Sequence, residues 1–135
     1  MLWRFIFATQ RPVKILRMDI SDSAVDRIIL GLGTKGTTGI FGVMRRLDTL
    51  FPSSSISSKY EVADRRFREL LRGGHVQLVR QFLGRTERTE LIPDTEVDAI
   101  LRSSITWFPM NLGTETSQVS YETTDLGERL YQQIP

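Results

Sequence analysis

The sequence predicts one α+β domain in which helices pack beside a small sheet. Three segments with apolar side chains at helical spacing come first, over residues 22–32, 38–51 and 58–72. Two stretches rich in β-favouring residues, 75–83 and 118–124, come later, and a last helix follows the second of them. The 135 residues, 40% of them apolar, are enough for a single sizeable core.

The first helix is expected over residues 22–32. Ser21 and Ser23 are both suitable N-cap residues, because a serine hydroxyl accepts a hydrogen bond from a free backbone N–H group. The apolar side chains of this segment recur every three or four residues, at Val25, Ile28, Ile29 and Leu32. Gly31 and Gly33 are expected to end the helix, because glycine most easily adopts the conformations that stop one.

The second and third helices are predicted from caps and stop signals. Thr37 or Thr38 is expected to cap the second helix, whose apolar stripe ends just before Pro52. In the third, Ser58-Lys59-Tyr60-Glu61 is an S-x-x-E capping box, which predicts a helix start at the serine. Gly73-Gly74 predicts the end of this helix.

The remaining segments are a hairpin, a link and two short helices. Residues 2–20 contain two β-favouring runs around a proline, which predicts a hairpin or, alternatively, an arm that pairs two subunits. The charged stretch 84–93 is expected to be a turn-like link. Asp94 is expected to cap a further helix, and Thr124 or Asp125 to open the last one.

Two motifs mark junctions between helices and strands. The stretch "RELLRGGHVQLVR" joins the third helix to a strand through two glycines, and "YETTDLG", from Tyr121 to Gly127, joins the second strand to the last helix. Together they make the chain similar to the winged helix-turn-helix domain of bacterial transcription regulators, the group that includes MarR-like and PadR-like repressors. In that family the second motif is commonly Y-x-L-T-x-x-G, and Thr123 stands here where leucine is usual.

The resemblance implies one winged-helix domain over residues 1–135. The domain would divide into an N-terminal hairpin or arm, 1–20, and a three-helix core with the first wing strand, 21–83. An insertion between the wing strands, 84–117, would precede the second wing strand and C-terminal helix, 118–135. The implied function is the binding of double-stranded DNA, without catalysis or a cofactor, by a homodimer that presents two recognition helices.

The resemblance places the helix over residues 58–72 in the major groove of DNA. At about 100° per residue, Arg65, Arg68 and Arg72 fall in one stripe, away from the apolar side of this helix. An outward basic stripe is what phosphate neutralisation requires. The residues expected to contact DNA are Ser57, Ser58, Lys59, Arg65, Arg68, Arg72, Arg45, Arg46, Arg80, Arg85 and Arg88.

The arginine stripe has a second interpretation, as the solvated face of a helix. Glu61 with Arg65, and Asp64 with Arg68, are pairs of opposite charge four residues apart. Such pairs stabilise an exposed helix whether or not it binds DNA.

Charge is distributed unevenly along the chain. Residues 1–90 carry 16 Lys and Arg against 9 Asp and Glu, a balance of +7, whereas residues 91–135 carry 2 against 7, a balance of −5. Either the basic part meets a polyanion such as DNA, or the two parts attract each other within the domain.

The alternative function is protein binding on the same scaffold, as in an immunity protein, an antitoxin or an assembly subunit. It is favoured by the acidic C-terminal third and by an apolar cluster in the insertion, because DNA binding requires neither. Trp107, Phe108 and Met110 would form the partner surface, unless they are buried in the core.

Composition argues against several other functions. The chain has no cysteine and a single histidine, His75, so we expect no disulfide and no metal site. His75 is expected to be structural, because the sequence places no nucleophile and no orienting acid beside it. No run of about 18 apolar residues is present, so we expect no membrane-spanning segment. The absence of cysteine is compatible with a reducing cytoplasm, where we expect the protein to be located.

A glycine-rich motif, Gly31-Leu32-Gly33-Thr34-Lys35-Gly36, matches the G-x-G-x-x-G spacing of a dinucleotide-binding turn. That fold also needs a second parallel strand that ends in an acidic residue about twenty residues later. Asp48 is the acidic residue near that position, and it lies inside a predicted amphipathic helix. We therefore expect no nucleotide cofactor, and the glycines are predicted to link the first two helices.

Overall fold

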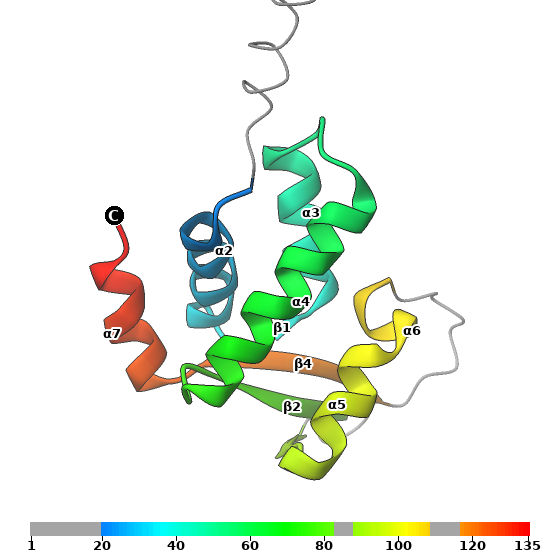
Figure 1. Ribbon diagram of the computed structural model, residues 1–135. Helices are drawn as coiled ribbons and strands as arrows, with labels where there is room; N and C mark the ends of the chain where they lie inside the picture. Colours follow the sequence, from blue (N-terminus) through cyan, green and yellow to red (C-terminus); the bar gives the residue numbers. More distant parts are fainter. Residues whose placement is uncertain (1–19, 83–87, 109–116) are drawn as a thin grey trace, which may run out of the picture.

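The computed structural model describes residues 20–82, 88–108 and 117–135. In this part of the chain, six helices accompany a four-stranded antiparallel sheet, which confirms the predicted α+β class. Figure 1 shows helices α2, α3 and α4 packed over one face of the sheet, with α7 beside α2 and with α5 and α6 beside α4. The hairpin or arm expected over residues 1–20 lies, except for Ile20, outside the described residues.

Helix α2 spans Asp22–Thr34, and the Ser21 hydroxyl caps it by accepting a hydrogen bond from the Ala24 N–H group. The predicted end at Gly31 and Gly33 is wrong, because both glycines lie within the helix. Gly33 is buried against strand β4, so its lack of a side chain serves packing rather than helix termination. The chain turns after the helix at Gly36, whose φ of +116° favours glycine.

Strand β1, Thr38–Gly39, precedes helix α3, Phe41–Leu50. The predicted threonine cap of this helix is wrong. Thr38 pairs with Tyr121 of strand β4, and the N-cap residue, Ile40, makes no side-chain cap. A strand of two residues is too short to show an alternating pattern in the sequence, so β1 is recognisable only from its pairing with β4.

Helix α4, Ile56–Arg72, is the longest in the described chain and begins two residues before the predicted start. Its N-cap is Ser55, whose hydroxyl accepts a hydrogen bond from the Ser58 N–H group over 3.1 Å. Several serines precede this helix, and the same capping chemistry operates one turn earlier than the S-x-x-E motif indicated. The predicted end is confirmed: Gly73 is the C-cap, and Gly74 has a φ of +75°.

The sheet has the strand order β1-β4-β2-β3, with every pair antiparallel. Strands β2, Val76–Phe82, and β4, Ser117–Thr123, were predicted and form the centre. Strand β3, Arg88–Leu91, lies in the stretch predicted to be a link. All four of its side chains are exposed, so the alternation of apolar and polar residues that marks a half-buried strand is missing.

Three further helices complete the described chain: α5, Asp94–Arg102; α6, Ser104–Trp107; and α7, Asp125–Gln133. Asp94 is the first residue of α5 rather than its cap, and the N-cap position is taken by Pro93. The predicted opening of α7 is confirmed, because the Thr124 hydroxyl accepts a hydrogen bond from the Gly127 N–H group over 3.1 Å.

The core lies between the sheet and helices α2, α3, α4 and α6. Phe67 of α4 stands at its centre, with edge-on contacts to Trp107 of α6 and Tyr121 of β4. The Tyr121 hydroxyl donates a hydrogen bond to the Ile29 carbonyl over 2.7 Å, so even the polar group of this buried ring is satisfied. Aromatic contacts therefore join α6 to α4 and to strand β4.

Candidate functional site

The outer face of α4 carries the predicted arginine stripe. Arg65, Arg68 and Arg72 lie along one side of the helix, opposite the buried Ala63 and Phe67. Arg65 and Arg72 are exposed, and Arg68 is half-buried. The helical period placed these side chains correctly, but it did not indicate which groups they bind.

Two arginines of α4 bind carboxylates of α2. Arg65 donates two hydrogen bonds to Asp22, over 3.0 and 2.8 Å, and Arg66 donates two to Asp26, both over 2.8 Å. Arg65 therefore pairs with Asp22 rather than with Glu61, the residue one turn away on its own helix. These paired hydrogen bonds are the strongest geometry for an arginine and a carboxylate, and they join α2 to α4.

The other two arginines of the stripe are also paired. Arg68 lies 3.1 Å from Asp64, as predicted, and 2.8 Å from Asp98 of α5, and Arg72 pairs with Glu69. A DNA phosphate would have to replace a carboxylate at each position, so the stripe offers less attraction to a polyanion than its sequence indicated.

Lys59 was expected on the outer face and is instead buried, with 4% of its surface exposed. It lies one turn before the buried Ala63, so its stem enters the core, and its ammonium group lies 2.9 Å from Asp48 of α3. Lys59 thus joins α3 to α4.

Four predicted contact residues are exposed, and none of them binds a carboxylate among the described residues. Arg45 and Arg46 are exposed on α3, and no Asp or Glu in the described ranges lies within 4.0 Å of either guanidinium. Ser57 and Ser58 are exposed in the first turn of α4. A turn of five residues, 51–55, separates the two helices. We call Arg45, Arg46, Ser57 and Ser58 the α3–α4 edge.

The arginines expected in the wing are dispersed. Arg80 of β2 lies 4.0 Å from Glu96 of α5. Arg88 of β3 stands over the Phe82 ring, 4.5 Å from its centroid, and 3.8 Å from Glu90. Arg85 lies outside the described residues.

The apolar cluster of the insertion is divided between core and surface. Trp107 is fully buried, its indole N–H donates a hydrogen bond to the Leu101 carbonyl over 2.9 Å, and it belongs to the core rather than to a partner surface. Phe108 is exposed and stacks on Tyr60 with a centroid distance of 6.2 Å. Met110 lies outside the described residues.

His75, between α4 and β2, is half-buried, and its buried Nδ1 atom has no hydrogen-bond partner among the described residues. No three His, Cys, Asp or Glu side chains in the described ranges gather where they could hold a metal ion. No helix in this part of the chain combines the length and the apolar character needed to cross a bilayer.

Sequence reasoning missed the carboxylates from other helices that bind the arginines of α4. Asp22 is 43 residues from Arg65, Asp26 is 40 from Arg66, and Asp98 is 30 from Arg68. No local pattern marks pairs at such separations. The only signal was the unequal charge of the two parts of the chain, and it accounts for the Asp98 contact alone.

These ion pairs predict a loss of stability in acid. The two hydrogen bonds from Arg65 hold the pKa of Asp22 below its ordinary value of 3.8, and Arg102 and Arg68 act in the same way on the pKa of Asp98. A carboxyl group whose pKa is lowered by folding stabilises the fold above its unfolded pKa, and this contribution is lost as pH falls through the folded value. We expect the urea midpoint to be steady above about pH 5 and to fall below about pH 4.

Asp22→Asn should have a lower urea midpoint at neutral pH and a shallower decline in acid than the parent. Glu128→Gln, which removes an exposed carboxylate of α7 with no arginine partner among the described residues, is the matched control. An acid decline of unchanged slope in Asp22→Asn would show that this ion pair does not contribute.

Comparison with protein-family models, with curated proteins and with solved structures gives no match to this chain. The function is therefore inferred from the geometry of the molecule.

Proposed function

We propose that this protein is a small non-enzymatic regulator of the winged helix-turn-helix class that binds duplex DNA as a homodimer. The observation that carries the proposal is the arrangement of α3 and α4. These two helices are joined by a short turn, pack on α2, and are followed by the antiparallel strands β2 and β4. This order is the one expected of a helix-turn-helix followed by its wing, with β3, α5 and α6 as an insertion.

The α3–α4 edge is the part of this surface best suited to DNA. Arg45 and Arg46 have no carboxylate partner within the described residues, so they gain the full attraction of a phosphate without losing an existing ion pair. Ser57 and Ser58 lie at the exposed start of α4, where a recognition helix presents side chains to base edges. Arg65 and Arg68, by contrast, are assigned a structural role.

Fluorescence anisotropy with a random duplex at two salt concentrations tests the proposal. The parent should bind, with an affinity that falls steeply as salt rises. Arg45→Ala combined with Arg46→Ala should weaken binding roughly tenfold and reduce the slope of log affinity against log salt by about 2, because two phosphate contacts are lost.

The matched control is Arg27→Ala combined with Arg129→Ala, which removes the same charge from α2 and α7. It should leave the affinity within about twofold of the parent, because α7 packs on α2 away from α3 (Figure 1). Equal losses in both double variants would mean that net charge alone, not the α3–α4 edge, attracts DNA.

The second candidate function, protein binding, is favoured by exposed apolar side chains beside the same edge. Ile56 of α4 is 64% exposed and Ile105 of α6 is 59% exposed, and Phe108 stacks on Tyr60, one turn after Ile56. Absence of any salt-sensitive DNA binding, together with a stable complex with a second protein that Phe108→Ala disrupts, would favour this function over DNA binding.

A further inference from the structure

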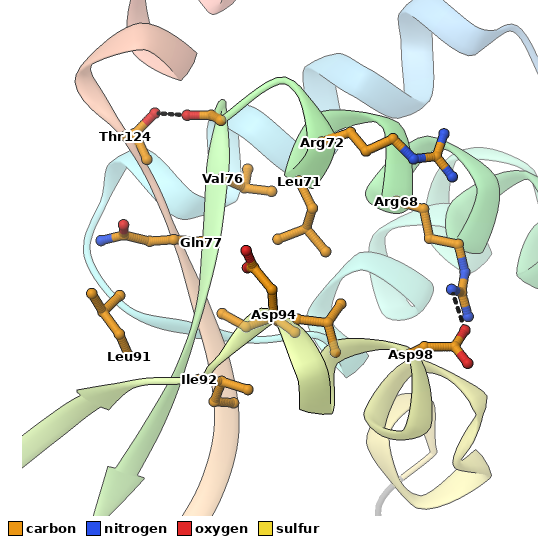
Figure 2. Close-up of a pocket in the computed structure, with 13 residues that line it drawn as sticks. Arg68, Leu71, Arg72, Val76, Gln77, Leu91, Ile92, Asp94, Asp98 and Thr124 are labelled. Carbon is orange, nitrogen blue, oxygen red and sulfur yellow. Dashed lines mark hydrogen bonds and ion pairs between the residues drawn. The ribbon is translucent and has the colours of Figure 1, made fainter.

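A cleft of about 650 Å³ lies at the C-terminal end of α4, between this helix, strand β2, the end of β3 and helix α5 (Figure 2). Aliphatic and polar groups share its walls, and the aliphatic side chains are Leu71, Val76, Leu78, Leu91, Ile92 and Val97. This volume is within the range of small-molecule sites, which are typically about 300–1,000 Å³. The cleft is separate from the α3–α4 edge, and no step of the proposed function uses it.

The cleft follows an edge of β2, residues 76–78, that pairs with no strand in the described part of the chain. Strand β3 pairs with residues 79–82 of β2, the Ile92 N–H group donates to the Leu78 carbonyl over 3.0 Å, and the chain then leaves the sheet at Pro93. In an antiparallel ladder, every second residue directs its backbone groups to the same neighbour. Val76 has the same parity as Leu78, so its N–H and C=O groups point toward the cleft rather than toward β4.

One charged group of the cleft, the Asp94 carboxylate, has no basic side chain beside it among the described residues. Asp94, the first residue of α5, is exposed and points into the space between the walls (Figure 2). No Lys, Arg or His of the described chain lies within 4.0 Å of its carboxylate. The two arginines at the rim have partners already, since Arg68 binds Asp64 and Asp98 and Arg72 binds Glu69. The group that lacks a counter-ion is therefore an anion.

We propose that this cleft is a binding site for a small organic cation, namely a primary amine on an apolar body. The ammonium group would bind the Asp94 carboxylate, with the Val76 carbonyl as a second acceptor. The body would lie against Leu71, Leu78 and Val97. Because Asp94 is exposed, solvent partly screens this ion pair, and contact of the apolar body with the aliphatic side chains adds to it.

Isothermal titration of the full chain with phenethylamine tests this site. Two ligands with nearly the same body, phenethyl alcohol and hydrocinnamate, replace the cation by a neutral group and by an anion. We expect the amine to bind at least tenfold more tightly than either, because only the ammonium forms the charged hydrogen bond with Asp94. Tighter binding of hydrocinnamate than of the amine would overturn the proposal.

Two variants locate the site. Asp94→Asn keeps the shape of the side chain and should weaken amine binding at least tenfold, whereas Glu96→Gln, the same change of charge on the same helix, should not alter it. Val97→Phe keeps the carboxylate and fills the cleft, and should also abolish binding. Thermal unfolding of each variant verifies that it is folded. Unchanged amine affinity in folded Asp94→Asn would overturn the assignment.

The amine titration contains no DNA, and the Asp94, Glu96 and Val97 variants do not change the α3–α4 edge. Failure of the amine to bind would therefore leave the proposed DNA binding untouched, and loss of DNA binding would leave the cleft unaffected.

Discussion

Gly33→Ala should lower the free energy of unfolding by roughly 2–5 kcal/mol, although alanine favours helices over glycine. A β-carbon at this position would lie 2.8 Å from the Thr123 backbone nitrogen and 2.9 Å from Cε2 of Tyr121, and closer still to the Thr123 hydroxyl. Thr123 lies opposite Val76 in the register, and the next residue fixes it there, because the Thr124 N–H group donates to the His75 carbonyl over 3.0 Å; α2 would therefore have to move away from β4.

Movement of α2 would also break two hydrogen bonds that join it to the sheet. The Thr123 hydroxyl donates to the Leu30 carbonyl over 2.8 Å, and the Tyr121 hydroxyl donates to the Ile29 carbonyl over 2.7 Å. Each is worth about 1 kcal/mol, and the overpacking costs about 1–3 kcal/mol.

Urea unfolding followed by circular dichroism measures the Gly33→Ala effect, with Gly42→Ala as the control. Gly42 lies in α3, and a β-carbon there would have one neighbour within 4 Å, the Thr38 hydroxyl at 3.6 Å. This variant should therefore gain up to about 1 kcal/mol of stability from helix propensity. If both alanines stabilised the protein, the close approach of α2 to β4 would be refuted.

Trp107→Ala should destabilise the fold by about 3–5 kcal/mol, the usual range for deletion of a large buried aromatic side chain. Trp107 is fully buried, and its ring centroid lies 5.2 Å from that of Tyr60 and 6.2 Å from that of Phe67. The truncation would also leave the Leu101 carbonyl without the indole N–H that it accepts over 2.9 Å. Hydrogen exchange should increase most in α5 and α6, because Trp107 joins them to α4.

Ile105→Ala is the control for this prediction. It removes an exposed apolar side chain from the same short helix and should change stability by less than about 0.5 kcal/mol. If Trp107→Ala were as stable as Ile105→Ala, the indole would not be buried in the core. Trp107 would then lie on a partner surface, which was the other interpretation of the sequence.

Much of the fold could be predicted because its signals are local. The apolar stripe of α4, its end at Gly73-Gly74 and the Thr124 cap of α7 each depend on residues within about four positions of one another. Strands β2 and β4 were recognisable because they lie at the centre of the sheet and combine β-favouring side chains with partial burial.

The candidate site could be predicted only in part. Periodicity placed Arg65, Arg68 and Arg72 on one face, but it could not indicate that Asp22 and Asp98 bind two of them. Periodicity does place Lys59 on the buried side, one turn before Ala63, but it could not indicate the counter-ion that permits this burial, because Asp48 belongs to another helix. The cleft beside β2 has no signal in sequence, since its walls come from four separate elements.

The sequence by itself determined where most helices and the central strands form, because helix caps, glycine stops and apolar periods act over one turn or a few residues. The tertiary structure alone decided what Gly31-Leu32-Gly33 is for. As a motif it suggested a phosphate loop and then a helix end, yet it lies within α2, where Gly33 packs against β4 and Gly31 faces Tyr131 of α7. The residues that impose this contact, such as Thr123 opposite Leu30, are 93 positions away, and only folding brings them together.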